Sequence, residues 1–166
     1  GKTTTVRLLN GVLAPDAGRA TLLGLDPAIA GDAVRRRTGV LTENAGLDDR
    51  LTARENLVFT ARIRGMARDE AEHRAAEVLD QFAMTDMADL RVHGSSTAHR
   101  SRVALARSLL HDPEILFLDE PTSGLDPTAT REVIGLIARL ASEEGRTVVL
   151  CTHFLGEAGR LAELAA

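Results

Sequence analysis

Two adjacent carboxylates, Asp119 and Glu120, directly follow a run of four apolar residues, Ile115 to Leu118. Such a run is typical of a strand that is buried on both faces of a parallel sheet, and open α/β sheets bind ligands beyond the carboxyl ends of their strands. Because side chains alternate along a strand, the two acids should point in different directions. We therefore expect one carboxylate to hold a metal ion and the other to orient a water molecule, rather than a solvated strand end with two surface acids.

A second group that could do chemistry stands at the start of the chain. Gly1, Lys2 and Thr3 match the last three positions of the phosphate-binding pattern G-x-x-x-x-G-K-[ST], and a helix is expected behind them over residues 2–10. In a complete loop, backbone amides surround the phosphates, the lysine ammonium reaches the β and γ oxygens, and the hydroxyl ligates Mg²⁺. Three residues alone leave a chance match open, although Lys2 is the only lysine in the sequence.

A third candidate, His153, follows the apolar run Thr147 to Cys151, which predicts a second buried strand. His153 should then lie at the same sheet edge as Glu120; the alternative is a residue that caps the next helix. Cys151 is the only cysteine, and its apolar surroundings favour an inert buried thiol. Three other histidines lack such a context and are expected to face solvent: His73, His93 and His111.

The rest of the pattern predicts the elements that must position these residues. A short strand is expected over 38–42, and a helix from Thr52, which forms a capping box with Glu55, to about residue 64. Further helices are expected over 68–82, over 100–110, and from Pro127, which Asp126 caps, to Gly145. Strands and helices alternate at both ends of the chain, which predicts a parallel α/β sheet over about 1–46 and 111–166. An inserted α-helical subdomain is expected over about 47–110.

Length and charge limit the classes of function. With 166 residues the chain is long enough for one domain with its own core. The net charge of -4 provides no basic excess, which argues against nucleic acid as a partner. No apolar stretch approaches the roughly 18 residues that span a bilayer, and the first residues do not resemble a secretory signal. We expect a soluble, unexported chain that is part of a longer domain, because it begins at Gly1 and ends at Ala166 within a predicted helix.

The segment that follows the apolar strand carries a specific resemblance. It reads Leu118-Asp119-Glu120-Pro121-Thr122-Ser123-Gly124-Leu125-Asp126-Pro127. This run resembles the joined Walker B and D-loop segment of ABC-type ATPases, the nucleotide-binding subunits of ABC transporters. Three further segments match in the order of that family: Gly1 to Thr4 for the end of Walker A, Val103 to Arg107 for the helix after the signature, and Thr152-His153 for the switch histidine. The resemblance implies a P-loop NTPase fold with a RecA-like core.

The resemblance also implies a role for each matching residue. Lys2 and Thr3 would bind phosphates, Thr3 and Asp119 would hold Mg²⁺, Glu120 would polarise the attacking water, and His153 would contact the γ-phosphate of ATP. It places a further set of residues at the nucleotide: Gly1, Thr4, Glu43, Ser96 and Asp126.

Two positions depart from the family pattern. Where the family has Gln after the strand over 38–42, this chain has Glu43, which can accept from metal-bound water but lacks the amide donor. Where the family has the signature Leu-Ser-Gly-Gly-Gln, this chain has Ser95-Ser96-Thr97-Ala98-His99. Glycine permits close approach and unusual backbone angles, and the Cβ atoms of Thr97 and Ala98 should oppose both. We expect a weakened site, with a local sequence anomaly or a specialised asymmetric partner as the alternatives.

As a whole, the resemblance implies an ATPase that drives a transporter by closing two subunits around two ATP molecules. The segment 47–57 is most similar to multidrug or ABC-2-type exporters. The implied partners are transmembrane permease subunits and a second ATP-binding subunit, identical or different, on the inner face of the cell membrane. The alternatives are a nucleotide-binding structural subunit or remnant with little turnover, and a soluble ABC ATPase that acts outside transport.

Overall fold

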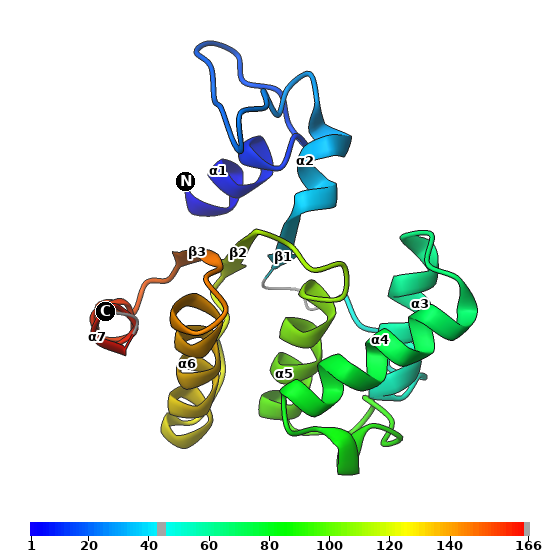
Figure 1. Cartoon of the computed structure of the whole chain (residues 1–166). Coiled ribbons are helices and arrows are strands. Elements are labelled where there is room, and N and C mark those ends of the chain that lie inside the picture. The colour runs from blue at the N-terminus through cyan, green and yellow to red at the C-terminus, as the bar shows by residue number, and fades with distance from the viewer. Residues whose placement is uncertain (43–45, 165–166) are drawn as a thin grey trace.

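The computed structural model of the chain describes residues 1–42 and 46–164. In this part of the chain the sheet has three parallel strands in the order β1-β2-β3, namely β1 (Thr38–Leu41), β2 (Ile115–Asp119) and β3 (Thr147–Cys151) (Figure 1). Ile115 pairs with Thr38 on one side and with Thr147 on the other, so β2 is the central strand. The predicted parallel α/β sheet is confirmed.

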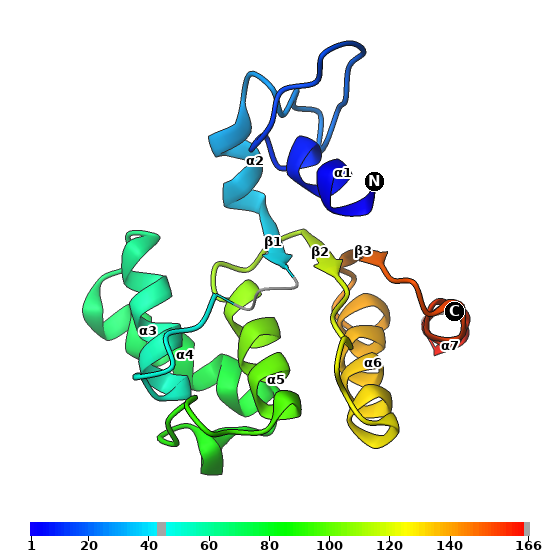
Figure 2. The same cartoon turned by 180° about the vertical axis from the view of Figure 1, so that it is seen from behind.

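Helices lie on both sides of this sheet. Their bounds are α1 (Lys2–Leu9), α2 (Gly31–Arg37), α3 (Ala53–Ile63), α4 (Arg68–Gln81), the 3-10 helix η1 (Thr85–Met87), α5 (Thr97–Ser108), α6 (Pro127–Ser142) and α7 (Leu155–Leu164). Front and back views both place α1 and α2 on one side of the sheet and α5 and α6 on the other (Figures 1 and 2). The all-helical stretch from α3 to α5 occupies the predicted insert, although its status as a separate subdomain stays a prediction.

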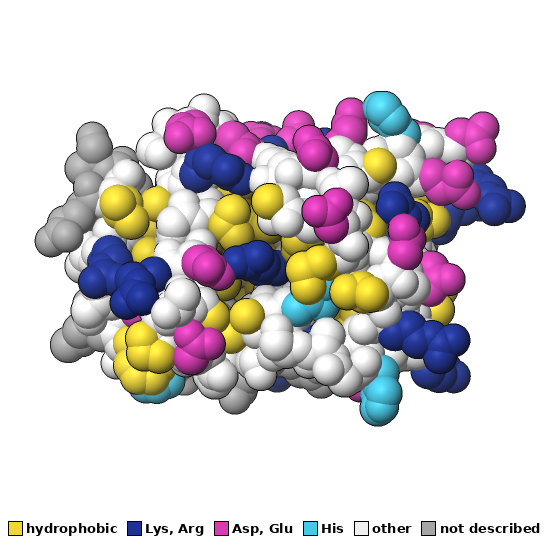
Figure 3. All heavy atoms as spheres, turned by 90° about the horizontal axis from the view of Figure 1, so that it is seen from below, with side chains coloured by type: hydrophobic (Ala, Val, Ile, Leu, Met, Phe, Trp, Pro, Cys, Tyr) yellow, Lys and Arg dark blue, Asp and Glu magenta, His cyan; other side chains and the backbone are white. Residues whose placement is uncertain are grey.

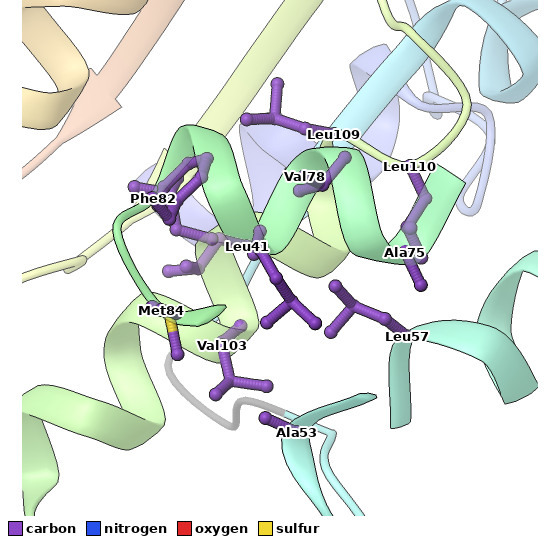
Figure 4. Packing of buried hydrophobic residues seen from close by; sticks show 14 of the residues in the cluster. Leu41, Ala53, Leu57, Ala75, Val78, Phe82, Met84, Val103, Leu109 and Leu110 are labelled. Atoms are coloured by element: carbon purple, nitrogen blue, oxygen red, sulfur yellow. The ribbon is translucent and has the colours of Figure 1, made fainter. Parts of the chain in front are cut away.

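The main hydrophobic core lies between the sheet and the helices α3 to α6. Helical side chains such as Leu57, Val78 and Val103 are fully buried and pack in one cluster with Leu41 of β1 (Figure 4). The helical stretch and the sheet therefore share a single core, which fixes the position of α5 relative to the strands.

Strand β2 divides its side chains between the two faces of the sheet. Leu116 and Leu118 belong to the main core, whereas Ile115 and Phe117 pack in a second cluster with Val6 of α1. This is the period-2 alternation of a strand, and it leaves β2 buried on both faces as its apolar run predicts. The buried strand holds Asp119 and the residue after it at a fixed place below the N-terminus of α1.

Local capping explains where the helices begin. The Thr52 hydroxyl accepts from Glu55 N at 3.1 Å while Glu55 Oε2 accepts from Thr52 N at 2.8 Å, which is the predicted capping box. Helix α5 begins three residues before the predicted start, because Ser96 Oγ accepts from His99 N at 3.1 Å and caps it. Helix α6 ends at Ser142, before the predicted Gly145.

Two expectations about burial are wrong. Thr147 is exposed and the rest of β3, with Cys151, is only half-buried, because β3 pairs with a strand on one side alone among the described residues. His111 does not face solvent freely: its ring is half-buried, and Nε2 lies 2.9 Å from the carbonyl oxygen of Thr38. His73 and His93 are exposed as expected.

His99 gives the fold a pH dependence that can be measured. Its side chain is 3% exposed, neither ring nitrogen has a hydrogen-bond partner among the described residues, and burial, with the charge of Arg102, lowers its pKa from 6.5. Because the unfolded chain takes up the proton first as the pH falls below 6.5, the folded state loses stability there. Burial lowers the pKa of His111 too, so it contributes in the same direction.

We therefore expect the free energy of unfolding to be smaller at pH 5.5 than at pH 7.5. His99→Gln should reduce this difference, whereas His93→Gln, at an exposed histidine, should leave it unchanged. Urea denaturation of the three proteins at both pH values measures the effect. An equal pH dependence in the parent and the His99 variant would show that His99 titrates normally in the folded protein.

Candidate functional site

Three segments that are distant in the sequence meet at the carboxyl end of the sheet. From α1, Thr3 Oγ1 donates to Asp119 Oδ2 at 2.5 Å, and Lys2 Nζ donates to Glu120 Oε1 at 2.7 Å. From the segment after β3, His153 Nδ1 lies 2.7 Å from Glu120 Oε2. The structure thus brings together the residues that the sequence singled out for phosphate, metal and water chemistry.

The two adjacent carboxylates point to different partners. Asp119, the last residue of β2, is 3% exposed and faces Thr3. Glu120 has a φ of 53°, the left-handed region that a residue with a Cβ adopts only at a cost of about 1–2 kcal/mol. Its amide nitrogen donates to the carbonyl oxygen of Cys151 at 2.8 Å. Strain of this kind often marks functional residues, and here it accompanies the turn of Glu120 toward Lys2 and His153.

The surroundings of Glu120 keep it ionised. Burial raises the pKa of this carboxyl, but the hydrogen bonds and charges of Lys2 and His153 outweigh it, so the pKa lies below its usual range. A carboxylate in this state has only acceptor positions and can draw a proton from a bound water. Its side chain is 15% exposed, against 47% for Lys2, so the lysine can leave toward solvent or a ligand while the carboxylate stays.

The start of α1 suits an anion. No acidic residue lies in its first turn, and Gly1 provides no side chain to cap it. The amides of a free helix N-terminus carry a partial positive charge that attracts phosphate groups, and Lys2 adds a full charge there. Ligand phosphates would therefore compete with Glu120 for Lys2.

Thr3 and Asp119 fit a magnesium ion. Both offer hard oxygen donors, and Mg²⁺ is usually held by one or two carboxylates together with waters and substrate phosphates. The described residues contain no cluster of three or more His, Cys, Asp or Glu that could enclose a metal by itself. The donor set thus matches an ion shared with a phosphate ligand, and not a closed structural site.

Several predicted site residues lie elsewhere. Thr4 is exposed on α1. Asp126 is exposed and caps α6, and the hydrogen bonds from Ala129 and Thr128 lower its pKa. Ser96 caps α5, on the other side of the sheet from α1 (Figures 1 and 2). Glu43 lies outside the described residues.

The site includes one residue that sequence reasoning missed. Glu157 Oε2 accepts from Thr122 Oγ1 at 2.7 Å and from Thr152 Oγ1 at 3.1 Å. It therefore ties the loop that follows Glu120 to the residue that precedes His153. In the sequence Glu157 appears only as an acid near the start of a predicted helix, and nothing there indicates these two partners.

Comparison with known proteins identifies the family. The model of the family described as "ABC transporter" matches residues 1–123. The chain belongs to the ABC transporter family. Among curated members it is 41% identical over 163 residues to the daunorubicin/doxorubicin resistance ATP-binding protein DrrA of Streptomyces peucetius, a match that covers 98% of this chain and 49% of the relative. It is 40% identical over 161 residues to the Nod factor export ATP-binding protein I of Paraburkholderia xenovorans, covering 97% and 53%.

Solved structures of ABC proteins share the fold. The chain is 27% identical to the ATP-binding cassette MJ0796, solved as a post-hydrolysis dimer bound to ADP and Pi, with a TM-score of 0.81 over 95% of this chain and 72% of that one. For cbiO1 of Clostridium perfringens, described as part of the ABC transporter complex cbiONQ, identity is 26% and the TM-score 0.86, over 97% and 66% of the two chains. These similarities confirm the expected P-loop NTPase fold.

The chain spans about half the length of the curated ABC relatives quoted above. Within the described residues, none of the helices is long and apolar enough to cross a membrane.

Proposed function

We propose that the chain binds and hydrolyses ATP at the Lys2–Asp119–Glu120–His153 cluster, and that this hydrolysis powers export by an ABC transporter. The observation that carries the proposal is the contact of Glu120 with both Lys2 and His153, at the N-terminus of α1. A cation, a carboxylate and a second polar group are thus in direct contact, which supports phosphate binding and water activation at one site. The names of the relatives, which refer to drug resistance and Nod factor export, favour export as the purpose.

The side chains suggest an order of events. Phosphate groups of ATP would take Lys2 from Glu120, since the helix N-terminus and the ammonium both attract them. Glu120, still held by His153, would then accept a hydrogen bond from a water and take up its proton as the water attacks the γ-phosphorus. The bond from the γ-phosphorus to the bridging oxygen would break, and that oxygen would leave as part of ADP. Held by Thr3 and Asp119, Mg²⁺ would supply charge neutralisation on the phosphates.

A second ATP-binding subunit would complete the site. The resemblance places Ser96 and its neighbours against the nucleotide of an opposite subunit, and the relative MJ0796 was solved as a dimer. Thr97 and Ala98 form the first turn of α5, and neither has a positive φ. Both residues thus keep ordinary helical backbone angles, and the expectation that their side chains oppose unusual ones stays a prediction. Only the bulk of their Cβ atoms remains as an obstacle to close approach.

Restoring glycine at both positions tests this obstacle. In the complete protein, Thr97→Gly with Ala98→Gly should raise the steady-state ATPase rate several-fold, because the opposite nucleotide could then approach α5 more closely. The matched control is Ala88→Gly, which changes a small buried residue outside the predicted signature. This control should not raise the ATPase rate. If the parent protein alone hydrolyses ATP briskly and the glycines do not change the rate, the steric account is contradicted. Such a result would also remove the reason to expect an asymmetric partner.

The permease subunits would dock on the helical stretch. A groove of about 600 Å³ lies between α3 and α4, and it is lined by Phe59 and Val58 beside the charged Arg62 and Glu72. Phe59 is 57% exposed, and Ile63 further along α3 is also largely exposed. Charged side chains of both signs also surround exposed hydrophobic ones on the face shown in Figure 3. A surface with exposed large apolar side chains favours a protein partner, and we assign the groove to a membrane subunit at the cytoplasmic face of the cell membrane.

A further inference from the structure

Glu157 connects the two loops that carry the catalytic side chains of the proposed mechanism. It lies in the first turn of α7, is half-buried, and accepts from Thr122 and from Thr152 with the same oxygen, Oε2. In the described part of the chain its hydrogen-bond partners are thus hydroxyl groups and not cations. A hydroxyl that donates to a carboxylate forms a short, charge-assisted hydrogen bond, so Glu157 acts as a cross-link between the loops.

One end of this cross-link holds the loop that follows Glu120. Thr122 is only 3% exposed. Within the loop, Ser123 N donates to the carbonyl oxygen of Glu120, and Leu125 N donates to that of Thr122, both at 3.1 Å. Glu120 therefore begins a hydrogen-bonded turn that contains the buried Thr122 hydroxyl. Because a buried hydroxyl without a partner is unfavourable, removal of the Glu157 carboxylate should make this turn rearrange.

The other end holds the segment around His153. Thr152 Oγ1 donates to Glu157 and accepts from Phe154 N at 3.0 Å, which closes a turn around His153. The His153 side chain is 59% exposed, and its ring touches Glu120 and the neighbouring ring of Phe154. Since little packing holds so exposed a ring, the turn fixed by Thr152 determines where the imidazole lies.

We infer that Glu157 is a positioning residue for ATP hydrolysis, which maintains the 2.7 Å contact between His153 and Glu120 by cross-linking their loops. The reaction rests on the proposed function, whereas the cross-link rests on the geometry alone. In that mechanism Lys2 leaves Glu120 for the phosphates, so His153 becomes the side chain that orients the carboxylate. A displacement of about 1 Å at this stage can cost up to about a hundredfold in rate.

Turnover by the complete protein tests this role. Glu157→Ala should lower kcat about tenfold and leave the KM for ATP within about twofold, because the phosphates bind at Lys2 and the start of α1. Glu157→Gln should keep kcat within about twofold of the parent, since its amide oxygen can accept from both hydroxyls. The control Glu143→Ala, at an exposed carboxylate after α6, should change neither value.

A parental stoichiometry of ATP binding in each variant shows that a lower kcat does not come from unfolded protein. An unchanged kcat in Glu157→Ala, or a raised KM alone, would overturn the inference.

Thr152 provides a second variant that leaves Glu157 in place. Thr152→Val keeps the shape of the side chain and removes the hydroxyl that Glu157 binds, so it should lower kcat several-fold. Adding Glu157→Ala should then lower kcat by less than it does in the parent, because the two residues act through one contact. Parental turnover by Thr152→Val, or fully additive effects, would show that Glu157 does not act through this threonine and would overturn the inference.

Imidazole ¹H–¹⁵N spectra of the complete protein without nucleotide separate the cross-link from the reaction. The His153 Nδ1 signal should shift in Glu157→Ala and stay near its parental position in Glu157→Gln. An unshifted signal in both variants would overturn the positioning role. If the parent does not cleave ATP, the proposed function and the catalytic effect of Glu157 both fail, while a signal that shifts only in the alanine variant would still support the positioning of His153.

Discussion

Replacing Glu120 by Gln should lower ATP turnover by the complete protein about a thousandfold, within the 10²–10⁴ that a positioned general base contributes. Gln has nearly the same shape, and its side-chain oxygen can still accept from Lys2. The amide lacks the negative charge that draws a proton from water, and its nitrogen cannot accept from His153 as Glu120 Oε2 does. ATP affinity should stay within about threefold of the parent, because the phosphates bind to Lys2 and the start of α1.

Steady-state turnover and equilibrium nucleotide binding measure the two halves of this prediction. The control is Glu132→Gln, which changes a carboxylate that pairs with Arg102 away from the site and should leave turnover unaltered. Turnover by the Glu120 variant at the parental rate would show that another group activates the water.

Truncating Phe117 to Ala should destabilise the fold by about 3–5 kcal/mol. Phe117 is 0% exposed at the centre of β2, where it packs with Val6 of α1. Its removal leaves a cavity between the strand that carries Asp119 and the helix that carries Lys2 and Thr3. Because surrounding side chains collapse into such cavities only in part, the lost contacts are not recovered. The change is measured by denaturant unfolding of the complete protein, from the unfolding transition of the domain that contains Phe117.

Phe59→Ala is the matched control for this deletion. It removes the same atoms from α3, but Phe59 is 57% exposed, so stability should change by less than about 1 kcal/mol. The complete protein with this substitution should also bind less to membranes that contain the permease, if the groove between α3 and α4 is the docking surface. Equal destabilisation by the two truncations would contradict the buried packing of β2.

The sequence predicts the site well where local pattern determines the structure. The four apolar residues before Asp119 are typical of a strand that is buried on both faces, and the structure shows that strand. The carboxyl ends of parallel strands bind ligands, and the two carboxylates contact the start of α1 there. The capping residues Thr52 and Asp126 likewise mark helix starts, because they satisfy free amides within a few residues of themselves. Asp119 and Glu120 also face different partners, as expected, although Glu120 lies beyond β2 and its positive φ turns its side chain.

Features set by distant partners escape sequence reasoning. The apolar run of β3 is indistinguishable from that of β2, yet β3 is half-exposed because only one neighbouring strand covers it in the described chain. His111 binds a carbonyl oxygen that lies 73 positions away in sequence, and Glu157 joins two threonines from different loops. Neither contact leaves a periodic signal. The early start of α5 is different, because its signal is local: Ser96 belongs to the segment that resembles the signature, and it also caps the helix.

Equilibrium titration of the complete protein with ATP and Mg²⁺ tests the central claim most directly, namely that nucleotide phosphates bind where Lys2 meets Glu120. Lys2→Ala should weaken ATP binding at least about thirtyfold, since truncating one member of a close charge pair costs about 2 kcal/mol or more. Arg36→Ala, which removes an exposed cation from α2, should leave the affinity unchanged. ATP binding by the Lys2 variant as tight as that of the parent would contradict the account.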